Sequence, residues 1–155
     1  MFRDYRRGDL RACVSIVNRT MDRVHARVCR EDLLAKVYPG TTRKRYTLVE
    51  RKVLTVKNKV VALVCLYRLG TYPDNILGID WLAVDPEYQS KGIGSRLVKW
   101  SERRARIYKK NVLFVWSVKA AIPFYKRHGF RKSSIIPIDM EEDREAVFLA
   151  KRVRL

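Results

Sequence analysis

A glycine-rich loop between an apolar run and a long amphipathic segment is the feature of this sequence best suited to bind a ligand. Residues 81–95 read WLAVDPEYQSKGIGS, in which Gln89, Gly92 and Gly94 form the pattern Q-x-x-G-x-G. Glycines let a backbone approach a ligand closely, and the first turn of a helix leaves amide N–H groups unpaired. With the helix dipole, these groups would suit a pyrophosphate. An ordinary strand-to-helix turn can also carry two glycines, and the pattern is neither a Walker loop nor the full dinucleotide motif.

The elements around this loop follow from apolar periodicity and from turn residues. Helices are predicted at residues 9–21, 31–38, 92–110 and 119–127. Strands are predicted at residues 1–7, 47–56, 59–69, 76–84, 112–116, 130–137 and 146–153. No repeat, low-complexity tract or linker divides the chain, so we expect one domain over residues 1–155 with a mixed α/β (α+β) architecture, a sheet with helices packed against it.

A second segment, residues 121–130 (AIPFYKRHGF), follows the loop after one more predicted strand. With the two segments in this order, the sequence resembles the GCN5-related N-acetyltransferase (GNAT) superfamily, specifically over residues 76–136. The resemblance implies the acyl-CoA N-acyltransferase fold, a single mixed, mostly antiparallel sheet of about six to seven strands flanked by four helices, with splayed central strands. It also implies acetyl-coenzyme A as donor and an amine as acceptor.

The resemblance further assigns site residues. The backbone of Leu82, Ala83 and Val84 would bind the pantetheine arm, and a strand bulge near Leu82 would aim an N–H at the thioester carbonyl. Tyr125 would protonate the departing thiolate, although it could instead be a buried aromatic of the helix. The remaining cofactor-binding candidates, in the loop and around the next helix, are Gln89, Ser90, Lys91, Gly92, Ile93, Gly94, Ser95, Ser117, Val118 and Lys126.

The sequence departs from the family pattern where a general base is expected. Gly78 and Leu113 stand where relatives carry a glutamate, and Val118 stands where many carry an asparagine, for which the neighbouring Ser117 could partly substitute. Asp80 shares a strand side with Gly78 and is the first candidate base. The acidic turn with Glu141 and Glu142 supplies the second, and a water chain or an amine that arrives neutral would need no side-chain base.

The net charge of the chain limits the classes of molecule that it is expected to bind. Thirty-four Lys and Arg against sixteen Asp and Glu give a net charge of +18, which attracts polyanions and repels polyamines. A protein amine is therefore the favoured acceptor, and association with nucleic acid or the ribosome is open. One predicted helix face carries only cations, either a solvated surface or a docking stripe: Arg96, Lys99, Arg103, Arg106 and Lys110.

An alternative function follows from this surface and from the missing base: a catalytically weak binding module that holds RNA or an acidic protein. Three cysteines without CxxC spacing predict neither a disulfide framework nor a metal site, and favour a cytoplasmic location. No apolar run is long enough for a membrane helix. The three tryptophans, Trp81, Trp100 and Trp116, are expected in the core.

Overall fold

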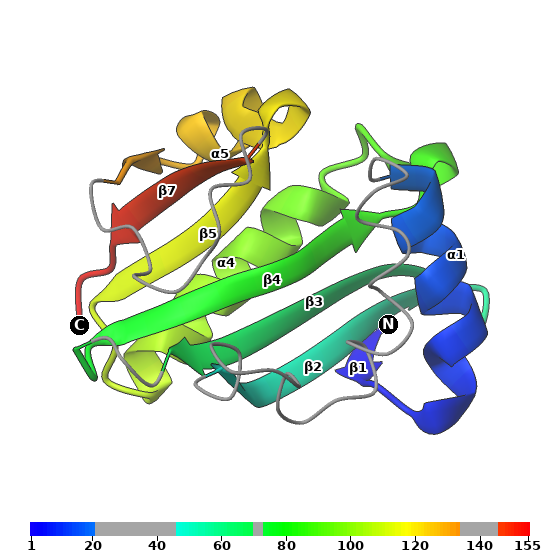
Figure 1. The fold of residues 1–155 in the computed structure, drawn as a ribbon. Coiled ribbons are helices and arrows are strands. Elements are labelled where there is room, and N and C mark those ends of the chain that lie inside the picture. The colour runs from blue at the N-terminus through cyan, green and yellow to red at the C-terminus, as the bar shows by residue number, and fades with distance from the viewer. Residues whose placement is uncertain (21–45, 70–72, 134–145) are drawn as a thin grey trace.

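The computed structural model describes residues 1–20, 46–69, 73–133 and 146–155. Within them a seven-stranded sheet has the order β1-β2-β3-β4-β5-β7-β6 (Figure 1). Neighbouring strands are antiparallel except for the parallel pair β4 and β5, which confirms the mixed, mostly antiparallel sheet. The strands are β1 (Phe2–Asp4), β2 (Tyr46–Val56), β3 (Lys59–Leu69), β4 (Ile76–Val84), β5 (Val112–Val118), β6 (Arg131–Lys132) and β7 (Ala146–Arg152).

The hairpin of β2 and β3 forms where the sequence predicts it. Val56 pairs with Lys59, so only Lys57 and Asn58 connect the strands. Both connecting residues have positive φ, 47° and 62°. Two-residue turns of this kind match the right-handed twist of the flanking strands, and asparagine tolerates such a backbone better than most residues.

Helices cover both faces of the sheet (Figure 1). Helix α1 (Leu10–Thr20) lies on one face over β3 and β4, and helix α4 (Ile93–Ile107) lies on the other under β3, β4 and β5. Helix α5 (Ile122–Arg127) follows β5. Short 3-10 turns stand at η1 (Arg7–Asp9), η3 (Pro86–Tyr88) and η4 (Lys119–Ala121). The second predicted helix, residues 31–38, lies outside the described residues.

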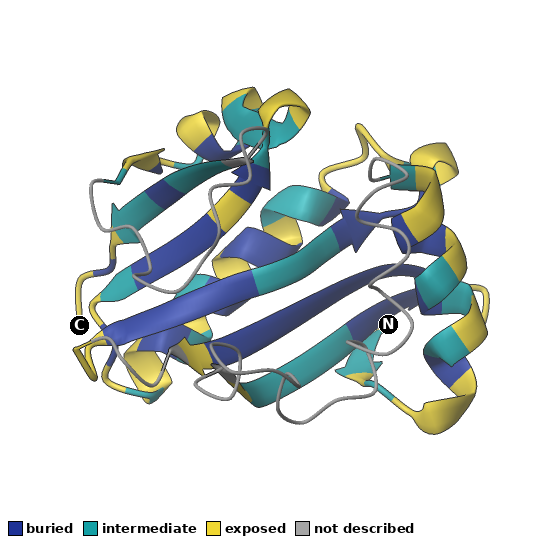
Figure 2. Cartoon of the chain, in the orientation of Figure 1, coloured by how far each residue is buried: buried dark blue, intermediate teal, exposed yellow. Residues whose placement is uncertain are grey.

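The two largest buried clusters of the described residues hold these layers together, and Figure 2 shows the buried residues concentrated along the central strands. The larger cluster joins α4 to the sheet around Leu77, Leu97 and Leu113, each 0% exposed. The smaller cluster lies under α1 and includes Cys13 and Cys65. Burying this apolar surface is the main favourable term of folding and fixes the middle of the sheet as a rigid platform.

The expectation that all three tryptophans pack in the core is wrong for Trp116. Its side chain is 37% exposed and stacks on Phe148, with ring centroids 5.7 Å apart. Alternation along β5 explains the difference, since Val115 and Ser117 face the α4 side and leave Trp116 on the opposite face. Trp100 is nearly fully buried, and Trp81 is partly buried against the cluster under α1.

Candidate active site

Two parallel strands part in the middle of the sheet. β4 and β5 pair from Ile76 with Val112 as far as Ile79 with Val115, although both strands continue beyond. Figure 1 shows the two strands diverging toward their C-terminal ends. In the described part of the chain, no strand pairs with the β5-facing side of β4 after this point. Unpaired backbone groups along a strand can bind an extended ligand as a further strand would.

A β-bulge lies on β4 beside this opening. Leu63 pairs with Ala83 and Cys65 pairs with Asp80, so two residues, Trp81 and Leu82, oppose one on β3. Trp81 adopts a left-handed φ of 40°, rare for a large side chain. The extra residue puts Asp80 and Trp81 toward the α1 side, while Leu82 packs against the cluster on the α4 side. The bulge expected near Leu82 is therefore present, and it re-aims the backbone at this position.

The corner after β4 is held by a buried carboxylate and an amide. Asp85 is 0% exposed; its Oδ1 accepts the Glu87 N–H at 3.2 Å and its Oδ2 accepts an Arg19 guanidinium at 2.8 Å. Gln89 Nε2 donates to the Val84 carbonyl at 3.0 Å. Gln89 therefore fixes the loop against the end of β4, a structural task within the predicted phosphate site.

The amides at the start of α4 stand open. Ser90 and Gly92 both have positive φ, 59° and 75°, which bends the loop into a concave turn before the helix. Within the described residues, no protein acceptor takes a hydrogen bond from the N–H groups of residues 90–95, and the helical ladder begins with the Arg96 N–H on the Gly92 carbonyl. A turn of successive free N–H groups at a helix N-terminus binds anions, and a phosphate is the natural ligand.

The two glycines of the loop have different roles. A Cβ on Gly92 would meet nothing within 4 Å, so its positive φ is what requires glycine. A Cβ on Gly94 would lie 3.1 Å from the Phe124 ring, so this glycine lets α5 pack against the first turn of α4. The open space at Gly92 is compatible with a phosphate on the loop.

Helix α5 is tied to the same turn by a contact that sequence patterns did not reveal. The hydroxyl of Ser95 and Nε2 of His128 lie 3.0 Å apart. Burial, with smaller effects from Lys151 and other charges, lowers the pKa of His128, which favours the neutral imidazole. Lys126 is exposed on the same helix.

Tyr125 lies in the larger buried cluster, which joins α4 to the sheet. It is 5% exposed, and its ring packs edge-on against Phe130, with centroids 5.4 Å apart. Burial, and after it the negative charge of Asp80, raises the pKa of the Tyr125 phenol above its ordinary value of 10.0. The phenol is therefore protonated at neutral pH, as a proton donor must be, and it lies near enough to Asp80 to be influenced by that charge.

Of the other predicted residues, Asp80 is half-buried and Ser117 is buried, with its hydroxyl donating to the Val118 carbonyl at 3.0 Å. Ser117 is thus engaged locally. Glu141 and Glu142 lie outside the described residues.

The described cysteines are poor nucleophiles. Cys13 and Cys65 are buried and free of disulfides. Burial raises the pKa of the Cys13 thiol to about 12 and raises that of Cys65 as well, so neither is ionised at neutral pH. In the described part of the chain, no three His, Cys, Asp or Glu side chains gather as metal ligands. None of the helices described is both long and apolar enough to span a bilayer.

Comparisons with known proteins agree with this geometry. The Acetyltransferase (GNAT) domain profile matches residues 43–132, more than half of the chain. No curated protein sequence matches. Solved structures do: the ribosomal-protein-S18-alanine N-acetyltransferase of Escherichia coli has a TM-score of 0.67 at 19% identity, with 100% of this chain and 94% of that chain covered.

Two further solved structures are similar over the whole of this chain. Ard1 from Thermoplasma volcanium has a TM-score of 0.73 at 19% identity and is covered over 98% of its length. The N-acetylglutamate synthase of Neisseria gonorrhoeae, complexed with coenzyme A and N-acetyl-glutamate, has a TM-score of 0.73 at 18% identity; 35% of that longer chain is covered. At these identities the likeness is one of fold.

Proposed function

Because the chain belongs to the GNAT acetyltransferase family and is thus an N-acetyltransferase with acetyl-coenzyme A as donor, we propose that its acceptor is a primary amine of a protein. Tyr125 is the general acid in this proposal, and Asp80 is the general base. The observation that carries the proposed reaction is the opening where β4 parts from β5 beside the bulge. The open amides of residues 90–95 lie at one end of this opening.

The donor would be held mainly by backbone. The N–H groups of residues 90–95 bind the pyrophosphate, and the β5-facing edge of Leu82, Ala83 and Val84 pairs with the pantetheine arm through the backbone groups other than the Val84 carbonyl, which already accepts Gln89 Nε2. Ser117, Val118 and Lys126 complete the set of residues proposed to contact the donor. Acetyl-coenzyme A supplies an activated acyl group, because a thiolate is a good leaving group.

The chain's own groups then move the protons. Asp80 accepts a proton from the attacking amine, whose nitrogen lone pair forms the new C–N bond at the thioester carbonyl. The N–H at the Leu82 bulge stabilises the negative charge that develops on the carbonyl oxygen. Tyr125 donates its proton to the sulfur as the C–S bond breaks and recovers a proton from solvent afterwards.

Two observations support a protein as the acceptor. The net charge of +18 repels free polyamines, which are polycations, and does not hinder the approach of a protein with an acidic surface. The Escherichia coli enzyme, similar in fold along the entire chain, is named for acting on an alanine of ribosomal protein S18. A terminal alanine amine is therefore the first acceptor to try.

The test measures thiol release from acetyl-coenzyme A with three acceptors: a peptide with a free N-terminal alanine, the same peptide with a blocked N-terminus and one lysine, and spermidine. Mass spectrometry locates the acetyl group on the product. We expect turnover with a peptide amine and little with spermidine. Efficient turnover of spermidine alone would overturn the acceptor, and thermal protection by acetyl-coenzyme A without turnover of any amine would favour the alternative binding module.

A further inference from the structure

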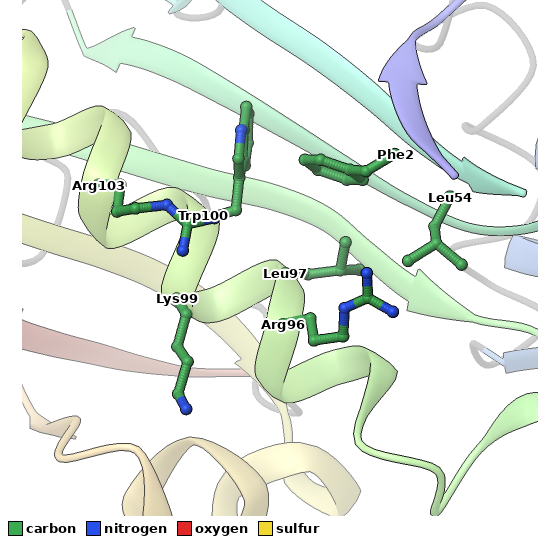
Figure 3. A pocket seen from close by; sticks show the side chains of 7 residues that line it. All are labelled: Phe2, Leu54, Arg96, Leu97, Lys99, Trp100 and Arg103. Carbon is green, nitrogen blue, oxygen red and sulfur yellow. The ribbon is translucent and has the colours of Figure 1, made fainter.

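A hollow lies between α4 and the edge of the sheet formed by β1 and β2 (Figure 3). Strand β3 separates this edge from β4. Its volume is about 180 Å³. A dry cavity of about 150 Å³ is large enough to take a benzene ring, so this hollow has room for one apolar side chain. Its lining residues are Phe2, Leu54, Arg96, Leu97, Lys99, Trp100 and Arg103.

The inner part of the hollow is apolar and rigid. Phe2 and Trp100 meet edge-to-face, with centroids 5.3 Å apart and ring planes at 75° (Figure 3). Leu54 and Leu97 are buried beside them, at 3% and 0% exposure. An apolar group that entered this site would displace water without leaving a polar group unpaired, which favours binding.

The rim is cationic, and its cations lack acidic partners. Arg96, Lys99 and Arg103 are exposed along one side of α4, and no ion pair joins them to a carboxylate in the described part of the chain. Neighbouring cations do have such partners. Arg104 binds Glu50, and Lys110, which the sequence placed on the exposed basic face, is instead 3% exposed and bound to Asp74.

We propose that this hollow docks an acidic segment of a partner protein, which places one apolar side chain against the part-exposed Phe2 and the aliphatic stems of the rim side chains. Carboxylates flanking that side chain would meet Arg96, Lys99 and Arg103. Charge complementarity selects an acidic partner and speeds its approach, while the apolar contact supplies the larger share of the affinity. The hollow is lined by residues of the β1–β2 edge and α4 only, so a docked segment need not cover the parted strands.

A nucleic acid fits this hollow less well. Single-stranded RNA binds by stacking bases on exposed aromatic faces and by hydrogen bonds to base edges. Trp100 is 7% exposed, with Phe2 against it, and so offers no free ring face. The inner lining presents aliphatic and aromatic groups, so only the phosphates would find partners.

The test uses two labelled peptides and the full-length chain. Both peptides are rich in glutamate; one carries a single central phenylalanine, and the other has alanine there. Fluorescence anisotropy should show the phenylalanine peptide binding about tenfold more tightly, because one buried aromatic side chain is worth that much or more. Equal affinities would mean that charge alone attracts the peptides, which would overturn the proposal.

Matched variants distinguish binding at this hollow from attraction by the net positive charge of the whole chain. Lys99→Gln with Arg103→Gln should weaken the phenylalanine peptide about fivefold, because two exposed ion pairs are lost. Arg11→Gln with Lys132→Gln removes the same charge from exposed positions elsewhere and should change affinity less than twofold. Equal losses in both variants, displacement of the peptide by acetyl-coenzyme A, or tighter binding of a single-stranded RNA to the hollow would each refute the proposal.

Discussion

Replacing Tyr125 by phenylalanine separates the catalytic role of this residue from its structural one. The change removes only the phenolic oxygen and keeps the ring that packs against Phe130. In the described part of the chain that oxygen has no hydrogen-bond partner. We therefore expect the free energy of unfolding to change by less than about 1 kcal/mol, since no hydrogen bond to a described residue is lost.

Catalysis should respond much more strongly. Loss of a general acid typically costs about 10²-fold or more in kcat, which is about 2.7 kcal/mol of transition-state stabilisation. Affinity for acetyl-coenzyme A should stay nearly unchanged, because backbone groups supply most of the proposed contacts. The assay is thiol release at saturating acetyl-coenzyme A, with thermal shift reporting donor binding. Because the pKa of Tyr125 lies above 10.0, its titration should not limit kcat at neutral pH.

Tyr108→Phe is the matched control. Its hydroxyl accepts a hydrogen bond from Arg104 at 3.0 Å, next to the C-terminal end of α4. This variant should lose about 0.5–1.5 kcal/mol of stability and keep its activity. Tyr125→Phe should thus lose catalytic rate and keep its stability, whereas Tyr108→Phe should lose stability and keep its catalytic rate. A Tyr125→Phe enzyme that turns over normally, or that fails to bind the donor, would refute the general-acid assignment.

Three further predictions concern neighbouring residues. Asp80→Asn should lower kcat about 100-fold at neutral pH; an unchanged rate would show that the amine arrives neutral or loses its proton to water. Gly92→Ala should destabilise the fold by about 1–2 kcal/mol through its positive φ and weaken thermal protection by acetyl-coenzyme A, whereas Gly8→Ala, also in open space, should preserve that protection. Burial raises the pKa of the Asp85 carboxyl, but hydrogen bonds from Arg19 and a backbone N–H outweigh this effect and hold the pKa below 3.8. The ionised Asp85 therefore stabilises the fold above pH 3.8, and this stability is lost as the pH falls through the lowered pKa. Arg19→Gln should move the acid unfolding midpoint, followed by circular dichroism, to higher pH, and an unmoved midpoint would contradict this linkage.

Local signals in the sequence were sufficient for most elements. The two-residue break at Lys57 and Asn58 predicted the hairpin, and the apolar period predicted the long helix within one to three residues of Ile93–Ile107. Turn chemistry and amphipathic spacing depend on neighbouring residues, so they can be read along the chain. The glycine pattern likewise predicted the start of α4, which begins directly after Gly92.

Contacts between distant residues could not be read in the same way. Nothing near Gly94 in the sequence indicates that it makes room for Phe124, or that Ser95 meets His128. The prediction of an exposed basic helix face was wrong at Lys110 for the same reason, because its ion-pair partner Asp74 precedes another strand in the sequence. Tertiary packing decides which cations find carboxylates.

The chain alone determined the order of strands and helices, the glycine turn and the residue types available for acid–base chemistry, because each depends on local backbone preference and composition. The family resemblance implied splayed central strands and a bulge near Leu82. Only the tertiary structure decided that β4 parts from β5 after Ile79, that the bulge turns Asp80 and Trp81 to one face, and that Tyr125 is buried within reach of the Asp80 charge. Those features arise where strands far apart in the sequence must share one sheet, and their geometry is set by packing on both faces at once.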